Sequence, residues 1–399
     1  MNWTLSEKSK PEFLSWADEL AAFRRDTHAA PELGFDTEGT VSRITDKLRS
    51  WGIEADNKVS PGGLIAIVRG TLPGASVAFR ADIDALPMED RSGSPWASRI
   101  PGRAHACGHD GHQTWLLGVL RYFALHRDFP GTLVGIFQPA EETEGGALSV
   151  IHSGVLRKYG VREILAAHDD PYLPKGVFGF HPGPFMASAD DFRITIRGKG
   201  THGARPHQGV DPIPVGCTLV SLLQTIVSRR TDPAEPAVVS VCSFTAGRFE
   251  ATNVIPDEAR LSGTIRAFSD ETREMAGKAL EEMADEVARA GHCEAAVEIG
   301  HGVRPTVNDP ALTRSVTEVA LSLFGPEHVN PCVPIIMGSE DFSEYERILP
   351  GTIFRVGIRD EAHKAPLHST AFDFNDEVLP SACTLITEML LSRFRRLAG

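Results

Sequence analysis

Residues 105–142 read HACGHDGHQTWLLGVLRYFALHRDFPGTLVGIFQPAEE, and the succession of helix and strand patterns in these residues indicates the fold class. A helical stretch from Gln113 to about His126 is followed by an apolar run of strand length at 132–137. Two runs rich in β-forming residues, at 64–68 and 76–81, precede the helix. The order strand, helix, strand is typical of an α/β domain with a parallel sheet.

The pattern changes from about Ser188, where a second unit is predicted. Its order is strand, helix, strand, strand, helix, strand, over residues 191–197, 212–229, 237–244, 259–267, 271–290 and 295–299. This order is that of a ferredoxin-like α+β domain. The α/β pattern then resumes with elements at 310–324, 352–356 and from about 378. We therefore predict an α/β domain, residues 1–187 and 302–399, into which a smaller domain, residues 188–301, is inserted.

Composition and charge exclude several function classes. The formal charge of -13, with 53 acidic against 40 basic residues, argues against a nucleic-acid partner. The sequence has no apolar run of membrane-spanning length, and charged residues interrupt its first twenty residues, so neither a membrane nor secretion is expected. The six cysteines lie far apart without a CxxC pair, which favours reduced thiols and a cytoplasmic location.

The loop HACGHDGH (105–112) is the densest cluster of metal-ligand side chains in the chain. Cysteine and histidine are donors that zinc selects, and Gly108 and Gly111 are expected to let the backbone approach a metal closely. The alternative is a polar loop that caps the following helix, with Asp110 at the N-cap. The residue types favour metal binding.

Acidic pairs follow two of the predicted strands. Glu141 and Glu142 come after the strand at 132–137, where ligands of open α/β sheets bind. On an extended backbone their side chains would point to opposite sides, so one could bind metal while the other acts as a general base. Asp82 and Asp84 follow the strand at 76–81 and could orient a ligating histidine. The alternatives are a solvated surface pair and a turn closed by Pro87.

Several strings together resemble one family of enzymes, and they are RRDTHAAPELGF, FRADIDALP, HACGHDGH, FQPAEE, GTHGARPH, TNVIPDEA, GTIR, MGSEDF and PLHSTAFDFNDE. They occur in order from about Arg24 to Glu377. The chain is similar to the aminoacylase, hippurate hydrolase and auxin-conjugate hydrolase branch of the dinuclear metallopeptidase-like amidohydrolases. The resemblance implies a zinc-peptidase-like catalytic domain with an inserted ferredoxin-like satellite domain that mediates dimerisation.

The resemblance also implies a set of metal ligands. They are Cys107, His109, Glu142, His168 and His368. Glu141 is implied as the general base. Asp84, which follows the strand at 76–81, is expected as a further catalytic residue. Five ligands indicate two divalent metal ions, zinc or manganese, with cobalt or nickel also compatible. At His168 the match is less close, because Asp169 and Asp170 replace residues that are commonly apolar or small.

Three residues of the inserted domain are implied to contact the substrate. His202 matches a histidine that polarises the scissile carbonyl, often from the partner subunit, and Asn253 and Arg266 match residues that hold the substrate carboxylate. As alternatives, Arg266 could be a surface strand residue and Asn253 could form a turn before Pro256. A homodimer or higher homo-oligomer is therefore expected.

The expected reaction is hydrolysis of the amide bond of a small N-acyl or N-aroyl amino acid. Glu141 would take a proton from the attacking water and return it to the leaving amine. A dipeptidase, a carboxypeptidase or an aryl-amine hydrolase could use the same metal centre. An alternative of another class is a catalytically silent scaffold, but such a protein would have no physical need for a base beside five ligands.

Overall fold

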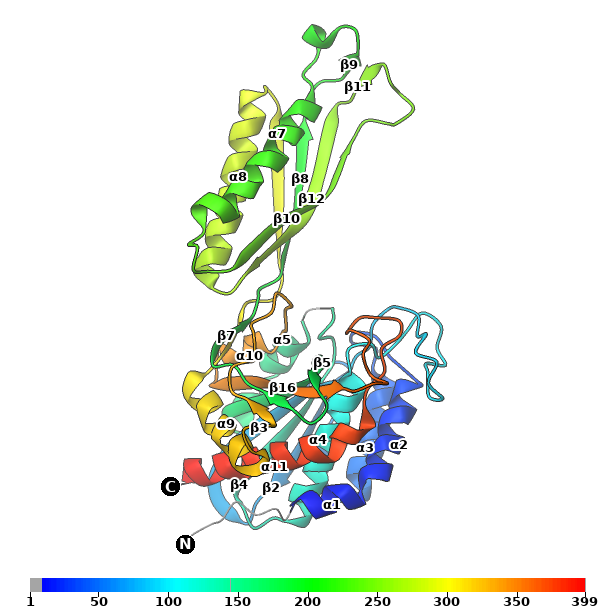
Figure 1. Cartoon of the computed structure of the whole chain (residues 1–399), viewed down its shortest axis with the longest axis vertical. Helices are drawn as coiled ribbons and strands as arrows, with labels where there is room; N and C mark the ends of the chain where they lie inside the picture. The colour runs from blue at the N-terminus through cyan, green and yellow to red at the C-terminus, as the bar shows by residue number, and fades with distance from the viewer. Residues whose placement is uncertain (1–8, 144, 399) are drawn as a thin grey trace. The chain divides into compact units, whose positions relative to one another are not determined.

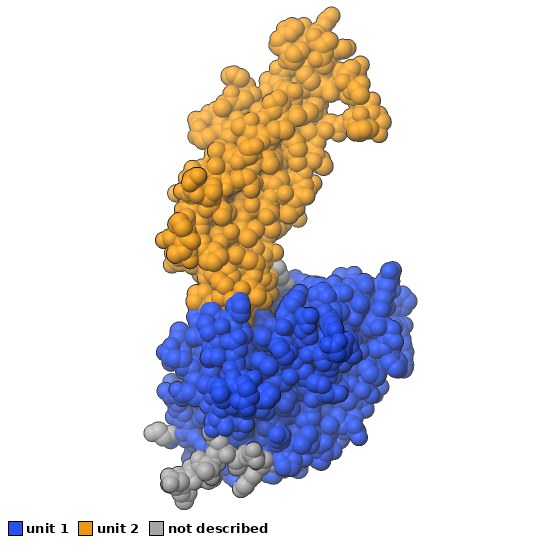
Figure 2. All heavy atoms as spheres, viewed as in Figure 1, with its two compact units in different colours: residues 1–183, 307–334, 344–399 blue, residues 184–306, 335–343 orange. Residues whose placement is uncertain are grey.

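The computed structural model describes residues 9–143 and 145–398, and its chain separates into two compact units (Figure 2). The larger unit comprises residues 1–183, 307–334 and 344–399, and the smaller unit comprises 184–306 and 335–343. The predicted division at 187/188 and 301/302 differs from this one by a few residues, and the segment 335–343 was not expected in the smaller unit. Residues 1–8 of the charged N-terminal stretch lie outside the described residues.

An eight-stranded sheet forms the centre of the larger unit (Figure 1), in the order β1-β2-β4-β3-β5-β16-β6-β15. The four central strands β4, β3, β5 and β16 are parallel to one another. The strands in sheet order are Glu54–Asp56, Leu64–Arg69, Pro130–Gln138, Leu72–Asp82, Val161–Pro174, Gly351–Arg359, Phe178–Gly179 and Val329–Asn330. Strand β5 was not predicted, and it provides the central position of the sheet.

Helices α4 and α11 pack against β3 and carry much of the apolar core. Burial of Trp115, Leu116 and Phe123 on α4, against Leu385 and Met389 on α11, removes large apolar side chains from water and stabilises this unit. The helices of the unit are α1 Ser9–Ser15, α2 Ala17–His28, α3 Glu38–Ser50, α4 His109–Leu125, α5 Gly146–His152, α6 Val155–Lys158, α9 Pro310–Phe324 and α11 Leu379–Ala398, with a short 3₁₀ turn at Asp376–Val378.

The smaller unit is ferredoxin-like. Its four-stranded antiparallel sheet has the order β10-β12-β8-β13, and α7 and α8 pack together beside it (Figure 1). Alternate residues of β8 (Asp190–Arg197), such as Phe192, Ile194 and Ile196, enter the core of this unit. The other elements are α7 Pro212–Thr225, a π-helical turn Ile226–Arg230, β10 Ala237–Ala246, β12 Glu258–Ala267, α8 Asp270–Ala290 and β13 Glu294–His301.

Small elements complete the two units. Strands β9 (Thr201–His202) and β11 (Val254–Ile255) form a two-stranded sheet, and a 3₁₀ turn covers Pro206–Gln208. Strands β7 (Gly183–Met186) and β14 (Thr306–Asn308) pair with each other, and the short helix α10 covers Ser343–Glu346. Among the described residues, no helix combines the length and the apolar character that crossing a membrane requires.

Candidate metal centre

Strand register places three ligand-bearing segments at one edge of the large sheet. Asp82, at the end of β3, pairs with Gln138 at the end of β4. Arg80 pairs with Ala166 on β5, so His168 lies level with Asp82 two residues further along. Carboxyl ends of parallel strands are where α/β sheets bind ligands, so the site begins at this edge.

The ligand loop leads directly into α4, which begins at His109. Its N-cap is Gly108, in a left-handed conformation with φ 80°. The prediction of Asp110 as the N-cap was therefore wrong, because the helix starts earlier than expected. Asp110 is instead buried with its Oδ2 atom 2.8 Å from His28 Nδ1 and 3.3 Å from Arg24 Nη1.

The two glycines of this loop have different surroundings. A Cβ atom on Gly108 would lie 2.1 Å from Asp169 Oδ1, and one on Gly111 would lie 2.2 Å from the ring of Phe374. Gly108 therefore allows a buried carboxylate to lie against the loop between Cys107 and His109. Gly111 serves packing against an aromatic ring, which corrects the expectation that it makes room for a metal.

The acidic pair Glu141 and Glu142 follows a turn in which Ala140 has φ 55°. Their carboxylates converge instead of pointing apart as expected, because this left-handed residue ends the extended backbone of β4. Glu141 Oε2 and Glu142 Oε1 each lie 3.9 Å from His109 Nε2. The buried carboxylate of Asp84 accepts the main-chain N–H groups of Glu141 and Glu142 at 3.1 and 3.2 Å, which fixes the turn.

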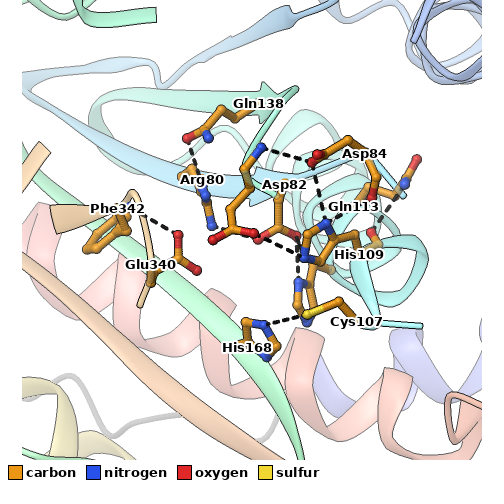
Figure 3. A network of polar contacts seen from close by, with 12 residues as sticks. Arg80, Asp82, Asp84, Cys107, His109, Gln113, Gln138, His168, Glu340 and Phe342 are labelled. Carbon is orange, nitrogen blue, oxygen red and sulfur yellow. Dashed lines mark hydrogen bonds and ion pairs between the residues drawn. The ribbon is translucent and has the colours of Figure 1, made fainter. Parts of the chain in front are cut away.

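The five predicted ligands form two groups that share one sulfur. Cys107, His109 and His168 offer ligand atoms within 4.8 Å of one another, and so do Cys107, Glu142 and His368. Cys107 Sγ lies 3.5 Å from His168 Nε2, and His368 Nε2 lies 3.4 Å from Glu142 Oε1. Figure 3 shows Cys107, His109 and His168 near one another and near Asp82, with Asp84 on the opposite side of the His109 ring. The sequence elements that carry these atoms are far apart in the chain, and the fold brings them together.

Strained backbone accompanies two of these segments. His368 has φ 59°, a conformation that side chains other than glycine rarely adopt, and its main-chain N–H donates to Ala106 O at 2.8 Å. Three described residues other than glycine have a positive φ, and two of them, Ala140 and His368, lie at this site. Such strain persists where the surrounding structure requires a particular side-chain position.

The two buried imidazoles have their outer nitrogen atoms fixed. His109 Nδ1 lies 2.9 Å from Asp84 O and His168 Nδ1 lies 2.7 Å from Asp169 O, so each ring donates from Nδ1 and directs Nε2 toward the group. Burial, with His112 and Arg355 nearby, lowers the pKa of His168 well below its usual range. His168 is therefore neutral, and its Nε2 lone pair is available to a cation.

The remaining charges also fit a cation. Burial and the nearby Glu142 raise the pKa of the Cys107 thiol well above its usual range. Burial opposes protonation of His109, but the nearby Asp82 carboxylate raises its pKa well above the usual range. The Cys107 thiol and the His109 imidazole thus hold protons beside the carboxylates of the site. A divalent metal ion would displace these protons when it binds.

Two unsatisfied atoms provide a direct test of fit. His109 Nε2 and Glu142 Oε1 are buried without a hydrogen-bond partner in the described part of the chain, and they face each other at 3.9 Å. Buried polar atoms rarely lack a partner unless an ion or water supplies one. The two atoms belong to different ligand groups, and a metal ion held by each group would satisfy one of them, so the residues present fit the two ions that the sequence implied.

A buried network behind the site was predicted only in part, because Asp82 was expected to orient a ligating histidine and instead contacts His112, which is not among the predicted ligands. His112 Nδ1 lies 2.6 Å from Asp82 Oδ1, and His112 Nε2 lies 3.0 Å from both the carboxylate and the main-chain nitrogen of Asp169. Arg80 donates to Asp82 Oδ2 at 2.6 Å and to Gln138 Oε1 at 2.9 Å. The sequence feature that could have indicated this network is His112, the third histidine of HACGHDGH, three residues after His109.

The three predicted substrate-binding residues lie in the smaller unit and do not come together there. His202 on β9 pairs with Val254 on β11, and Gly203 N donates to Asn253 O at 2.7 Å, so His202 and Asn253 share one tip. Arg266 lies near the other end of β12, paired with Val238. About 26 Å of extended strand separates Arg266 from the start of β12 at Glu258.

Two overlapping groups of cysteine, histidine and carboxylate ligands lie at the strand ends of an α/β sheet, and a second carboxylate lies beside them. This combination defines a hydrolase of the metallopeptidase class. Comparison with known proteins identifies the family. Residues 78–392 match peptidase family M20/M25/M40, and the chain belongs to this family.

Curated relatives span nearly the whole chain. A thermostable carboxypeptidase of Saccharolobus solfataricus is 34% identical over 382 residues, covering 94% of this chain and 95% of the relative. An IAA-amino acid hydrolase of Arabidopsis thaliana is 36% identical over 393 residues, covering 97% and 87%. Hippurate hydrolase of Campylobacter jejuni is 32% identical over 381 residues, covering 96% and 98%.

A solved structure has the same fold. A dinuclear metal binding peptidase of the M20 family from Bacillus subtilis superposes with a TM-score of 0.84 at 32% identity, covering 96% of this chain and 99% of that chain. The predicted α/β fold and the resemblance to dinuclear amidohydrolases are thereby confirmed. This chain is a hydrolase that acts on amide bonds.

Proposed function

We propose that this chain hydrolyses N-acyl or N-aroyl amino acids to a carboxylic acid and a free amino acid. The observation that carries the proposal is the pair of ligand groups sharing Cys107, with the carboxylate of Glu141 3.9 Å from His109 Nε2. The relatives named as hydrolases of hippurate and of IAA-amino acids support this substrate class.

Two divalent ions fit the donors, one with Cys107, His109 and His168 and one with Cys107, Glu142 and His368. When bound, these ions would lower the pKa of water and polarise the substrate carbonyl. Mixed sulfur, nitrogen and oxygen donors suit zinc or manganese, and cobalt or nickel are compatible. The shared sulfur requires Cys107 to be a thiolate, which the buried thiol becomes only when a cation compensates its charge.

Glu141 is the proposed general base. Its carboxylate converges on the ligand groups, and Asp84 holds its main-chain N–H, so the base keeps its position through the reaction. It would take the proton of the attacking water and return that proton to the nitrogen of the leaving amino acid. Asp84 acts through the turn and through its main-chain oxygen on His109, and it therefore sets the base and one ligand together.

Residues of the smaller unit are proposed to bind the substrate. The Arg266 guanidinium, which also donates to Thr264 Oγ1 at 2.5 Å, suits the carboxylate of an N-acyl amino acid, as does the amide of Asn253. The His202 imidazole could stabilise the developing oxyanion. Because Arg266 lies at the opposite end of β12 from His202 and Asn253, one chain cannot apply all three to one small substrate. We therefore propose a homodimer in which each site receives His202 and Asn253 from the partner.

The proposed location is the cytoplasm. All six cysteines lie among the described residues and are free thiols, and Cys217, Cys242 and Cys332 are exposed. Exposed free thiols are typical of a reducing compartment.

A carboxypeptidase is the second candidate, because the relative from Saccharolobus solfataricus carries that name. A peptide with a free carboxyl end and an N-acyl amino acid present the same amide bond next to the same carboxylate. The two functions therefore share the metal centre and differ only in the group that the acyl side of the substrate offers.

The test is Glu141→Gln assayed on N-acetyl, N-benzoyl and peptide substrates with metal supplied. We expect this variant to keep its metal and to lose at least about 100-fold in kcat, because glutamine cannot accept the proton. Glu361→Gln, at an exposed carboxylate, is the matched control and should retain full activity. Undiminished hydrolysis by Glu141→Gln would exclude this residue as the base, and cleavage of peptides alone would favour the carboxypeptidase.

A further inference from the structure

The His112 imidazole lies between two carboxylates that come from different strands. Its Nδ1 atom lies 2.6 Å from Asp82 Oδ1 on β3, and its Nε2 atom lies 3.0 Å from Asp169 Oδ1 on β5. All three side chains are buried, each with at most 1% of its surface exposed. The imidazole therefore joins the first turn of α4 to the carboxyl ends of two neighbouring parallel strands.

Each of the three joined segments carries a residue of the proposed metal centre. His109 precedes His112 by one helical turn, and Asp84 follows Asp82 by two residues. His168 precedes Asp169 directly, and its Nδ1 donates to Asp169 O. A shift of His112 would thus be transmitted to two ligands and to the residue that holds the Glu141 turn.

The ring of His112 cannot reorient in place. It stacks on Trp115 with centroids 5.1 Å apart, and it meets the ring of His168 edge-on at 4.5 Å. The Asp169 carboxylate, which His112 contacts, also fills the space beside Gly108. The contact with His112 consequently fixes Asp169 against the loop that carries Cys107.

His112 could in principle be a ligand itself, since it lies within ligand distance of Asp82 and His109. Both of its ring nitrogens, however, face Asp82 and Asp169. Ligation through Nε2 would remove this contact from the buried Asp169 carboxylate, whose Oδ2 atom makes no hydrogen bond among the described residues. His109 Nε2, by contrast, is directed to the proposed centre and makes no hydrogen bond within the described part of the chain.

We propose that His112 is a positioning residue of the metal centre, which holds His168 and Cys107 at binding distance through Asp169. The proposal rests on the proposed two-metal centre and adds a role for a residue that touches neither substrate nor metal. Loss of His112 releases Asp169, and with it the main-chain oxygen that orients His168. The group containing His168 should therefore weaken more than the group containing His368.

The experiment is a competition between His112→Asn and a chromophoric chelator for Zn²⁺, with the cobalt-loaded protein followed by its visible spectrum. Outer contacts of metal ligands are typically worth about 10- to 100-fold in affinity. We expect one of two Zn²⁺ ions to weaken by about that factor, the other to stay bound, and the cobalt spectrum to change. Asp82→Asn, which preserves side-chain shape, is a second variant expected to give a smaller loss at the same ion.

His28→Asn is the matched control. His28 is equally buried and also lies between two carboxylates, Asp110 at 2.8 Å and Asp90 at 3.3 Å, but it does not contact His168. It should lose stability while retaining both metal ions. If His112→Asn binds both ions with wild-type affinity and loses only stability, as His28→Asn does, the positioning role is excluded. If the wild-type chain binds fewer than two ions, the proposed centre itself fails, and the two failures are thereby distinguished.

Discussion

Cys107 Sγ lies 3.5 Å from His168 Nε2, although 61 residues separate them in the sequence. The contact exists because β5 pairs with β3 in parallel, so that His168 arrives at the sheet edge where the ligand loop also ends. The relationship makes Cys107 the one donor common to both groups of ligands.

Replacing this shared donor should affect both ions. We expect Cys107→Ala to reduce the metal content from two ions per chain to less than one, as measured by elemental analysis. Cys332→Ala, at an exposed thiol, is the control and should retain both. A Cys107→Ala protein that keeps one full equivalent would show that the sulfur serves one ion only.

Asp84 supports both the base and a ligand, and its removal should slow catalysis more than it weakens metal binding. Asparagine at this position would present an N–H group to the main-chain N–H of Glu141 or Glu142, where the carboxylate now accepts both. We expect kcat/KM of Asp84→Asn to fall by about 10- to 100-fold. The surface change Asp46→Asn, which leaves the site untouched, should have no effect. An unchanged kcat/KM would contradict the role of Asp84.

Much of the fold could be predicted from local patterns. The run at 132–137 belongs to β4, the helix predicted from Gln113 belongs to α4, and the six predicted elements between 191 and 299 are all present. Glu141 and Glu142 could be singled out because a strand end followed by two acids marks the binding edge of a sheet. These features depend on residues close together in the sequence.

Other features depend on long-range pairing and could not be predicted in this way. Strand β5 has only a short apolar run before Asp169 and Asp170, and its strand character is set by β3 and β16 on either side. The contacts of His112 join residues 30 and 57 positions apart. The convergence of Glu141 and Glu142 depends on the left-handed Ala140, which no residue preference indicates.

Gly108 should tolerate no side chain. A methyl group there would meet Asp169 Oδ1 at 2.1 Å, and φ of 80° adds a conformational cost of about 1 kcal/mol or more. We expect Gly108→Ala to weaken Zn²⁺ binding and to lower the melting temperature. Gly102→Ala is the control, because Gly102 has a similar φ of 72° but open space around it. It should show the conformational cost alone, so equal metal affinity in the two variants would contradict the packing argument.

The positions of His202 and Arg266 predict complementation between subunits. Coexpressed His202→Ala and Arg266→Ala chains should form mixed dimers in which one of two sites has every substrate-binding residue, giving about a quarter of wild-type activity. His202→Ala with Asn253→Ala is the matched control, because both residues lie on the same tip and each site would remain defective. Failure of the first pair to regain activity would indicate that each chain builds its own site.

His28 should make stability depend on pH in a defined window. Burial opposes its protonation, but Asp110 and Asp90 raise the pKa of His28 to about 9, above roughly 6.5 in an unfolded chain. The folded chain thus holds a proton that the unfolded chain releases, so this contribution is complete below about pH 6.5 and disappears as the pH rises through about 9. The shift corresponds to about 3 kcal/mol. We expect urea unfolding to show wild type more stable than His28→Asn near pH 6, with the difference shrinking by up to that amount near pH 10. Asp110 and Asp90 lose their charges only in acid, so they do not titrate between about pH 6 and about pH 10. If the stability difference between wild type and His28→Asn stays constant across this window, His28 is neutral in the folded chain.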